Sequence, residues 1–420
     1  PFDRATINTL AGPVVAGVHA LRVDAGQAQI YVAVAAPLTS FVAPLYNTAI
    51  VGVLVSLILV AAAVPIIILF ARRLSQPLRM LAQDAERIRN FEIDGTLHIS
   101  SRIAEVRELL DANELMKSTL GAFSKYVPRE LVRRMLRSSL NPEPGGERRP
   151  VTLLFTDIQG FTQLAESVDP ETLMRKMSMY LERMVGEVQR RRGTVDKFVG
   201  DAMMVYWNAP EQQHDHAFLG CAAALMCCYA SNEMNHGWRE AGEVALPTRF
   251  GVNTGECIVG NVGSKNRLDF TVLGATVNLA SRLEGLNKHY GTQILVSKAT
   301  RDGTRDEHEQ ERFLFRTVDL VQAKGTGQPT LIYELVGAHA SSGLDPVLAH
   351  QKDIVRCADW ERVFARYVAR DWAALTKEAE AYSAKYPFDP LAQVYLRRAW
   401  VYLHSPPAKD WDGVEKFQTK

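Results

Sequence analysis

Two aspartates stand where predicted strands end, and they are the first candidates for chemistry. Asp157 follows the apolar strand predicted at Val151–Phe155 and precedes a glycine-containing turn. Asp201 follows Gly200 at the tip of a hairpin predicted for residues 195–207. Carboxylates on two strand ends can hold a pair of metal ions, the arrangement that phosphoryl transfer uses. Asp157 taken alone is equally explained as a residue that caps a turn.

Polar side chains at two further places could contact a nucleotide. Lys197 lies four residues before Asp201, so on an extended strand it is roughly 13 Å away and cannot serve the same metal. This spacing suggests a second site contributed by a partner chain. Asn278 and Arg282 share one face of a predicted helix, where both can reach one phosphate. Arginine offers permanently charged donors for a developing negative charge, although by spacing alone a solvated pair is the better explanation.

An α+β domain with a mainly antiparallel sheet and flanking helices is predicted to position these residues. Residues 141–150 contain three prolines and two glycines and mark the boundary before the domain. A helix is predicted at Pro170–Arg192, and strands and helices continue to Leu335. Its apolar face consists of Leu173, Met177, Leu181, Met184 and Val188. The glycines of residues 249–264 are interpreted as permitting a close backbone turn.

Four motifs occur in order along the chain: FTDIQGFT at residues 155–162, VDKFVGDAMMVYW at 195–207, RFGVNTGECIVGNVGS at 249–264 and DFTVLGATVNLASRL at 269–283. Together they resemble the class III adenylate and guanylate cyclase catalytic domain over residues 151–336. The resemblance is specific, because all four motifs keep the order and spacing of the family. The glycine-glycine-acidic-acidic-phenylalanine signature of diguanylate cyclases, a rival enzyme class, is absent from the sequence.

The resemblance implies a homodimer in which two chains pair head to tail and each of two active sites lies across the interface. One protomer would bind two Mg²⁺ or Mn²⁺ ions through Asp157 and Asp201. The backbone amides of Gly160, Phe161 and Thr162 would lie near the phosphates of the same site. Each chain would therefore supply the metal half of one site.

The same resemblance implies which residues the other protomer contributes. Lys197 and Thr271 would face the purine, and Asn278 and Arg282 would face the transition state. Lys324 matches a lysine that contacts the triphosphate. Many adenylate cyclases carry aspartate where this chain has Thr271, and the lysine and threonine combination resembles a branch of bacterial adenylate cyclases that uses threonine.

The resemblance therefore predicts an enzyme that makes 3′,5′-cyclic AMP and pyrophosphate from ATP. The ribose 3′-oxygen would attack the α-phosphorus in line, while a metal and Arg282 draw charge onto the departing pyrophosphate. Lys197 only donates hydrogen bonds, whereas the hydroxyl of Thr271 accepts and donates. A preference for ATP with measurable use of GTP is therefore expected. A guanylate cyclase and a catalytically silent nucleotide-binding receptor are the alternatives.

Residues 47–71 are predicted to form a transmembrane helix in a lipid bilayer. No charged residue occurs at the 23 positions of Ala49–Ala71. At 1.5 Å per residue this segment spans about 34 Å, enough to cross a bilayer. Three arginines follow within residues 72–79, so the positive-inside rule places the catalytic part in the cytoplasm, below the inner membrane. Residues 1–46 would be the end of an extracytoplasmic sensor domain, with its last strand at Gln29–Ala36.

Residues 72–121 resemble a HAMP linker, in which two short coiled-coil helices are joined by a polar connector at residues 90–101. The first apolar seam consists of Leu74, Leu78, Leu81, Ala85 and Ile88, and the second begins with Ile103, Val106 and Leu110. An ordinary helical hairpin is the alternative. Residues 123–136 resemble the transducer helix that joins sensory modules to cyclase domains, within a segment of helix and linker at 122–150.

Residues 337–420 are predicted to form a small helical tail. Residues 355–404 hold two amphipathic helical patterns, rich in tryptophan, tyrosine and alanine, and the pattern is broken at Pro387. The aromatic residues are predicted to pack the tail rather than to bind a cofactor. The tail resembles a helical repeat.

The charge and cysteine content limit which classes of binding partner and which cellular compartment are expected. The 48 basic residues nearly cancel the 47 acidic ones without a long block of like charge, so nucleic acid is not a predicted partner. Five cysteines without a zinc-like pairing suggest buried free thiols in a reducing compartment. The sequence begins at Pro1 without a signal-peptide pattern, and it is interpreted as the downstream part of a longer protein.

Overall fold

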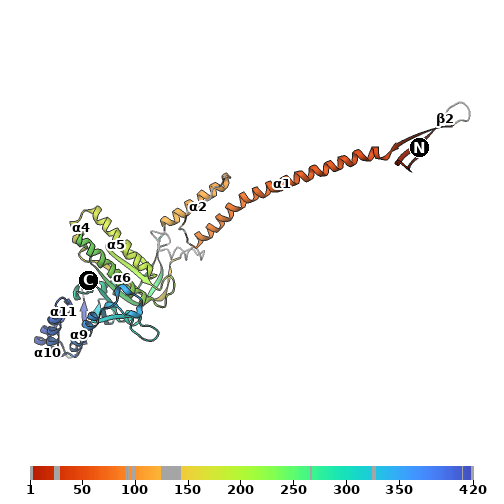
Figure 1. Cartoon of the computed structure of the whole chain (residues 1–420). Coiled ribbons are helices and arrows are strands. Elements are labelled where there is room, and N and C mark those ends of the chain that lie inside the picture. The colour runs from red at the N-terminus through yellow and green to blue at the C-terminus, as the bar shows by residue number, and fades with distance from the viewer. Residues whose placement is uncertain are drawn as a thin grey trace. The chain divides into compact units, whose positions relative to one another are not determined.

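The computed structural model divides the chain into two compact units (Figure 1). The first comprises Pro1–Ile88 with Glu92–Thr119, and the second comprises Arg89–Phe91 with Leu120–Lys420. The described residues are 3–22, 29–90, 92, 95, 101, 103–123, 143–264, 267–323, 328–408 and 410–417. Most of the predicted connector at 90–101 and of the predicted transducer helix at 123–136 lies outside them.

The first unit begins with a three-stranded antiparallel sheet. Its strands are β1 (Asp3–Thr9), β2 (Gly12–Arg22) and β3 (Gln29–Pro37), in that order. The predicted strand at Gln29–Ala36 is confirmed as β3, which pairs with β2 along its whole length. The sheet leads directly into a long helix.

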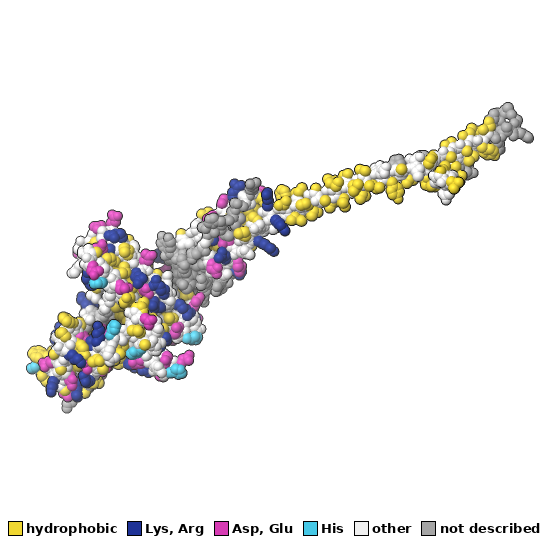
Figure 2. Space-filling view, in the orientation of Figure 1, with side chains coloured by type: hydrophobic (Ala, Val, Ile, Leu, Met, Phe, Trp, Pro, Cys, Tyr) yellow, Lys and Arg dark blue, Asp and Glu magenta, His cyan; other side chains and the backbone are white. Residues whose placement is uncertain are grey.

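That helix, α1 (Leu38–Arg89), runs for 52 residues and is a candidate membrane-spanning helix by its length and apolar composition. Hydrophobic side chains follow one another along it, and the other described residues leave them uncovered (Figure 2). A helix that is apolar on all sides needs apolar surroundings. The predicted membrane segment and the first seam are one continuous helix, although Pro77 lies inside it.

A polar contact joins the end of α1 to α2 (Ala104–Phe123). Asp84 of α1, whose side chain is buried, accepts hydrogen bonds from Asn113 Nδ2 at 2.7 Å and Lys117 Nζ at 3.1 Å. Leu81 and Ile88 of α1 and Val106 of α2 are also buried. Both predicted seam segments are therefore helical, and the buried Asp84 carboxylate joins the two helices.

The second unit is built on one large mixed sheet in the order β12-β10-β11-β9-β7-β4-β6-β5, with β8 paired to β7. Its strands are β4 (Gly145–Ile158), β5 (Thr194–Val199), β6 (Ala202–Trp207), β7 (Thr248–Ser264), β8 (Arg267–Leu273), β9 (Ile294–Ser297), β10 (Phe313–Ala323), β11 (Thr330–Ala338) and β12 (Glu415–Phe417). Only the β7–β9 and β10–β12 pairs are parallel among the described strands, so the prediction of a mainly antiparallel sheet is confirmed. The sheet begins six residues before the predicted boundary at 151, because β4 already pairs with β7 at Gly145.

Helices cover both faces of this sheet. They are α4 (Phe161–Ser167), α5 (Pro170–Arg190), α6 (His216–Glu240), α7 (Ala275–Tyr290) and α8 (Lys298–Asp302). Side chains alternate along β4, so Leu154 packs with α5 and α6 in one core whereas Leu153 packs with Ala280 of α7 in another. The predicted helix at Pro170–Arg192 is confirmed as α5. All five cysteines are free and buried.

The glycines of residues 249–264 lie inside β7, so the predicted turn at this place is wrong. They permit close contact instead of a turn. A Cβ atom on Gly251 would lie 2.2 Å from the backbone nitrogen of Glu284, and one on Gly260 would lie 2.1 Å from the carbonyl oxygen of Gly145. The first contact lets α7 lie directly against β7.

The C-terminal residues form three helices rather than the two predicted patterns. These are α9 (Gln351–Val368), α10 (Trp372–Lys385) and α11 (Pro390–His404). Arg370, with a left-handed φ of 58°, breaks the first pattern, and the second break falls at the predicted Pro387. Trp360 of α9 and Tyr395 of α11 pack against Leu283 of α7 in a shared core. The tail is therefore packed onto the large sheet and onto α7 beside it.

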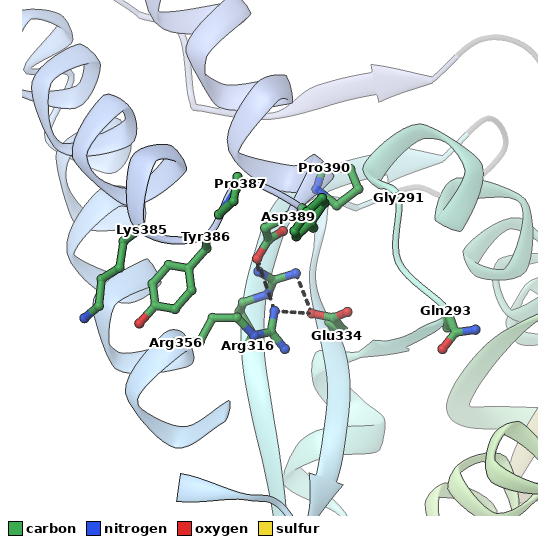
Figure 3. A pocket seen from close by; sticks show the side chains of 11 residues that line it. Gly291, Gln293, Arg316, Glu334, Arg356, Lys385, Tyr386, Pro387, Asp389 and Pro390 are labelled. Atoms are coloured by element: carbon green, nitrogen blue, oxygen red, sulfur yellow. Dashed lines mark hydrogen bonds and ion pairs between the residues drawn. The ribbon is translucent and has the colours of Figure 1, made fainter. Parts of the chain in front are cut away.

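A cavity of about 470 Å³ lies where the tail meets the sheet (Figure 3). Arg316 of β10 crosses it, pairing with Asp389 and, at 2.6 Å, with Glu334. Arg356 of α9 lies 3.1 Å from the same Asp389. The opposite charges in this cavity therefore pair with one another and join the tail to the sheet.

A second buried ion pair yields a test of how firmly the tail is attached. Arg398 of α11 lies 2.6 Å from Asp319 of β10, which is fully buried and also accepts a hydrogen bond from Tyr290 of α7. Arg398→Ala is expected to lower the free energy of unfolding by about 3–5 kcal/mol, because it leaves a buried carboxylate without its counter-ion. Thermal unfolding followed by tryptophan fluorescence measures this, since all six tryptophans lie in the second unit.

Arg362→Ala is the matched control for this experiment. Arg362 pairs with Asp359 on the same tail, but its side chain is 68% exposed. Removing an exposed pair should change the free energy of unfolding by less than about 1 kcal/mol. Equal effects of the two substitutions would contradict a tail anchored by the buried pair.

Candidate active site

The structure brings the two predicted metal-binding aspartates together. Asp157 lies near the end of β4, and Asp201 lies at the tip of the hairpin between β5 and β6. The Asp201 carboxylate accepts a hydrogen bond from the backbone N–H of Ile158 at 3.0 Å, which holds it against the end of β4. Burial, and then the charge of Asp201, raise the pKa of Asp157. The predicted hairpin is confirmed, and its tip places the carboxylate of Asp201 near that of Asp157.

Arg249 and Glu284 adjoin this pair and were not predicted as site residues. Arg249, opposite Asp157 in the β4–β7 register, donates to Asp157 Oδ2 at 3.0 Å, and its Nε lies 3.3 Å from Glu284 Oε1. Burial and the charge of Asp157 raise the pKa of Glu284 to about 7. Arg249 opens the third motif and Glu284 directly follows the fourth, but only the strand register and the contact of α7 with Gly251 show that they meet the aspartates.

The chemistry of this pair suits divalent cations. Asp157 and Asp201 present hard oxygen donors, and their mutual repulsion is the kind that a bound cation relieves. No cluster of three histidine, cysteine, aspartate or glutamate side chains suited to a metal occurs in the described part of the chain. Magnesium in such sites takes one or two protein carboxylates and completes its shell with phosphate oxygens and water. The residues therefore fit a metal that is shared with a bound triphosphate.

The predicted phosphate-binding amides follow directly on the end of β4. Gly160 adopts a left-handed conformation, with φ 70°, and precedes α4, which begins at Phe161. The first N–H groups of a helix, here those of Phe161 and Thr162, have no partner within the helix. These donors follow the Asp157 strand end in sequence and can serve an anion held there.

Lys197 of β5 and Thr271 of β8, the predicted purine-binding residues, share one polar neighbour. Asp196 joins them, because its Oδ2 accepts a hydrogen bond from Thr271 Oγ1 at 2.9 Å and lies 3.4 Å from Lys197 Nζ. The side chain of Lys197 is 43% exposed, whereas that of Asp196 is buried. The ammonium is therefore accessible to a ligand while its carboxylate partner is not.

Asn278 and Arg282 both belong to α7, as predicted. Asn278 is exposed, and Arg282 is half-buried. Its Nη1 is buried and makes no hydrogen bond with any described residue. No hydrogen bond or ion pair joins the described Asp157–Asp201 pair to Lys197, Asn278 or Arg282 within this chain. Lys324 lies outside the described residues.

Comparisons with known proteins cover the part of the chain that holds these residues. The family model described as "Adenylate and Guanylate cyclase catalytic domain" matches residues 145–337. "Adenylate cyclase 1" of Rhizobium meliloti (strain 1021) is 36% identical over 306 residues, which cover 73% of this chain and 45% of that relative. "Adenylate cyclase" of Anabaena cylindrica is 31% identical over 285 residues, which cover 63% of this chain and 55% of that relative.

The chain spans about half the length of these curated relatives. Among solved structures, the crystal structure of the guanylyl cyclase Cya2 is 34% identical, with a TM-score of 0.43. The alignment with it covers 49% of this chain and 100% of that chain.

Proposed function

Since residues 145–337 form a catalytic domain of the adenylate and guanylate cyclase family, we propose that this chain converts ATP into 3′,5′-cyclic AMP and pyrophosphate. The observation that carries the proposal is the pair of carboxylates, Asp157 and Asp201, held together at two strand ends. The two curated relatives named above are both called adenylate cyclases, which favours ATP as the substrate.

The proposed reaction forms one bond and breaks one bond at the α-phosphorus. The ribose 3′-oxygen attacks in line and loses its proton, and the bond to pyrophosphate breaks. Two divalent ions, when bound at Asp157 and Asp201, supply activation of the 3′-hydroxyl and stabilisation of the departing charge. Arg282 donates its unpartnered N–H groups to the charge that develops on the phosphate oxygens. Lys197 and Thr271 hold the purine and so fix the orientation of the sugar.

We further propose a homodimer with composite sites. The carboxylate pair and the purine-binding pair do not contact each other within one described chain, so a second copy is needed to complete each site. Apolar side chains next to the candidate site are uncovered in the single chain: Phe198 and Val199 at the hairpin are 48% and 60% exposed, and Ile258 and Leu273 are both 46% exposed. A second copy of the chain would cover such a surface.

Membrane attachment and signal input are proposed from the first unit. The apolar segment of α1 would cross the inner membrane, with the arginines at residues 72–79 and the catalytic domain on the cytoplasmic side. The β1–β3 sheet would belong to an extracytoplasmic sensor. The end of α1 and α2, joined through Asp84, would act as a HAMP-like linker over residues 72–121. Residues 122–150 would carry the signal onward as transducer helix and linker.

The nucleotide preference gives a direct test of the proposal. The detergent-solubilised chain, incubated with MnATP or MnGTP, is expected to form cyclic AMP with the higher kcat/KM and some cyclic GMP. Lys197→Glu combined with Thr271→Cys should remove ATP activity, because the pair no longer offers a donor for adenine N1. Higher kcat/KM for GTP in the same metal buffer would overturn the adenylate assignment and support the guanylate alternative. Absence of any product would support the silent receptor.

A further inference from the structure

Asp196 contacts both residues of the purine-binding pair, and the proposed reaction gives it no role. Its side chain is only 2% exposed, yet it belongs to β5, between Val195 and the accessible Lys197. Its polar contacts with Thr271 and Lys197 are with the two residues assigned to the purine. A buried carboxylate between two ligand-binding side chains controls what those side chains can offer.

A β-bulge directs Asp196 to this position. In the β5–β6 register Val195 pairs with Val205 and Lys197 pairs with Met204, so Asp196 is the extra residue that has no partner on β6. An extra residue of this kind re-aims a side chain relative to the regular alternation of a strand. The bulge thus lets neighbouring residues serve one site, with the Asp196 carboxylate toward Thr271 of β8 and the ammonium of Lys197 beside it.

We propose that Asp196 is a positioning residue that sets purine specificity by holding the Thr271 hydroxyl as a hydrogen-bond acceptor. The inference rests on the proposed function, in which Lys197 and Thr271 bind the purine. An ionised carboxylate only accepts hydrogen bonds, and a threonine hydroxyl has a single proton. Because that proton is donated to Asp196 at 2.9 Å, the purine meets only the lone pairs of Thr271 Oγ1.

This arrangement favours adenine over guanine for a simple reason. The exocyclic amino group of adenine donates to an acceptor, whereas the exocyclic oxygen of guanine would face Thr271 Oγ1 as one acceptor against another. A site in which a buried hydrogen-bond acceptor faces another acceptor on the ligand strongly disfavours binding of that ligand. Burial raises the pKa of Asp196, while the Thr271 hydroxyl and the Lys197 ammonium stabilise its ionised form. Thr271 then behaves toward the base as a carboxylate would, and the use of GTP is smaller than a freely rotating hydroxyl allows.

The test compares kcat/KM for ATP and GTP in one metal buffer, using the full chain in detergent. Asp196→Asn keeps the size of the side chain, but its amide can donate or accept a hydrogen bond. The Thr271 hydroxyl is then no longer required to donate its proton to residue 196. The ratio of kcat/KM for ATP to that for GTP is expected to fall about tenfold, mainly through better use of GTP. In a Thr271→Val background the same substitution should leave the ratio unchanged, because no hydroxyl remains to be oriented.

Asp269→Asn is the matched control. Asp269 is exposed and acts on Asp196 only through its charge, without a hydrogen bond to Thr271 among the described residues. It should leave the ratio unchanged.

An unchanged ratio in Asp196→Asn, or an equal fall in Asp269→Asn, would overturn the inference while the cyclase activity stands. If Asp196→Asn fails to fold, Asp196→Ser replaces it with the same expectation. A folded wild-type chain inactive on both nucleotides would instead overturn the proposed function and this inference with it.

Discussion

Asp157→Ala and Asp201→Ala are each expected to lower cyclase turnover by about 10³-fold or more, because the divalent ions proposed to bind there would supply several kcal/mol of charge stabilisation that neither variant could retain. Asp201 also accepts the N–H of Ile158, so its loss leaves a backbone donor unpaired. Asp201→Asn keeps an acceptor for that N–H and separates the loss of the charge from the loss of the contact. Cyclic AMP formation in Mn²⁺ and Mg²⁺ buffers, with and without chelator, provides the measurement.

Asp302→Ala is a suitable control for this series. Asp302 carries an exposed carboxylate that pairs with Lys298 in the short helix α8. Its removal takes away one negative charge of the same domain without touching the strand ends, and turnover should stay near that of the wild type. Near-wild-type turnover by a folded Asp157→Ala or Asp201→Ala chain would refute the metal assignment.

Mixing Asp201→Ala chains with Arg282→Ala chains is expected to restore activity that neither variant shows alone. In a composite dimer the two defects fall into the same site, and the other site keeps both residues. Random pairing makes half of the dimers mixed, each with one intact site, so about a quarter of the wild-type activity should return. The measurement is specific activity against mixing ratio, after dissociation and reassociation of the two purified variants.

A mixture of Asp157→Ala with Asp201→Ala is the control for this experiment. Both defects lie in the same half of the site, so every site in a mixed dimer retains one of them and no activity should return. Recovery in this control would indicate a different division of residues between the chains. No recovery in the first mixture, with heterodimers demonstrated, would show that each chain builds its own site.

Much of the site could be predicted because it depends on neighbours in the sequence. Gly200 and Asp201 between two apolar runs specify a hairpin tip, and the structure confirms it. The four-residue spacing of Asn278 and Arg282 places both on α7. The extent of the domain was less well predicted, because β4 takes its first residues from its pairing with β7 rather than from its own hydrophobic pattern.

The remaining features depend on contacts between residues far apart in the chain. Thr271 and Asp196 are 75 positions apart, and their hydrogen bond requires both the strand arrangement and a bulge that no periodicity announces. Arg249 meets Asp157 across a strand pair, and Glu284 reaches Arg249 because Gly251 lets α7 approach the sheet. Sequence alone therefore determined most of the strands and helices and the reactive side chain types, which follow from local patterns, but not the unbroken course of β7 or the three helices of the tail. Strand register and close packing are properties of the folded chain. They decided which of those side chains form hydrogen bonds and ion pairs with one another.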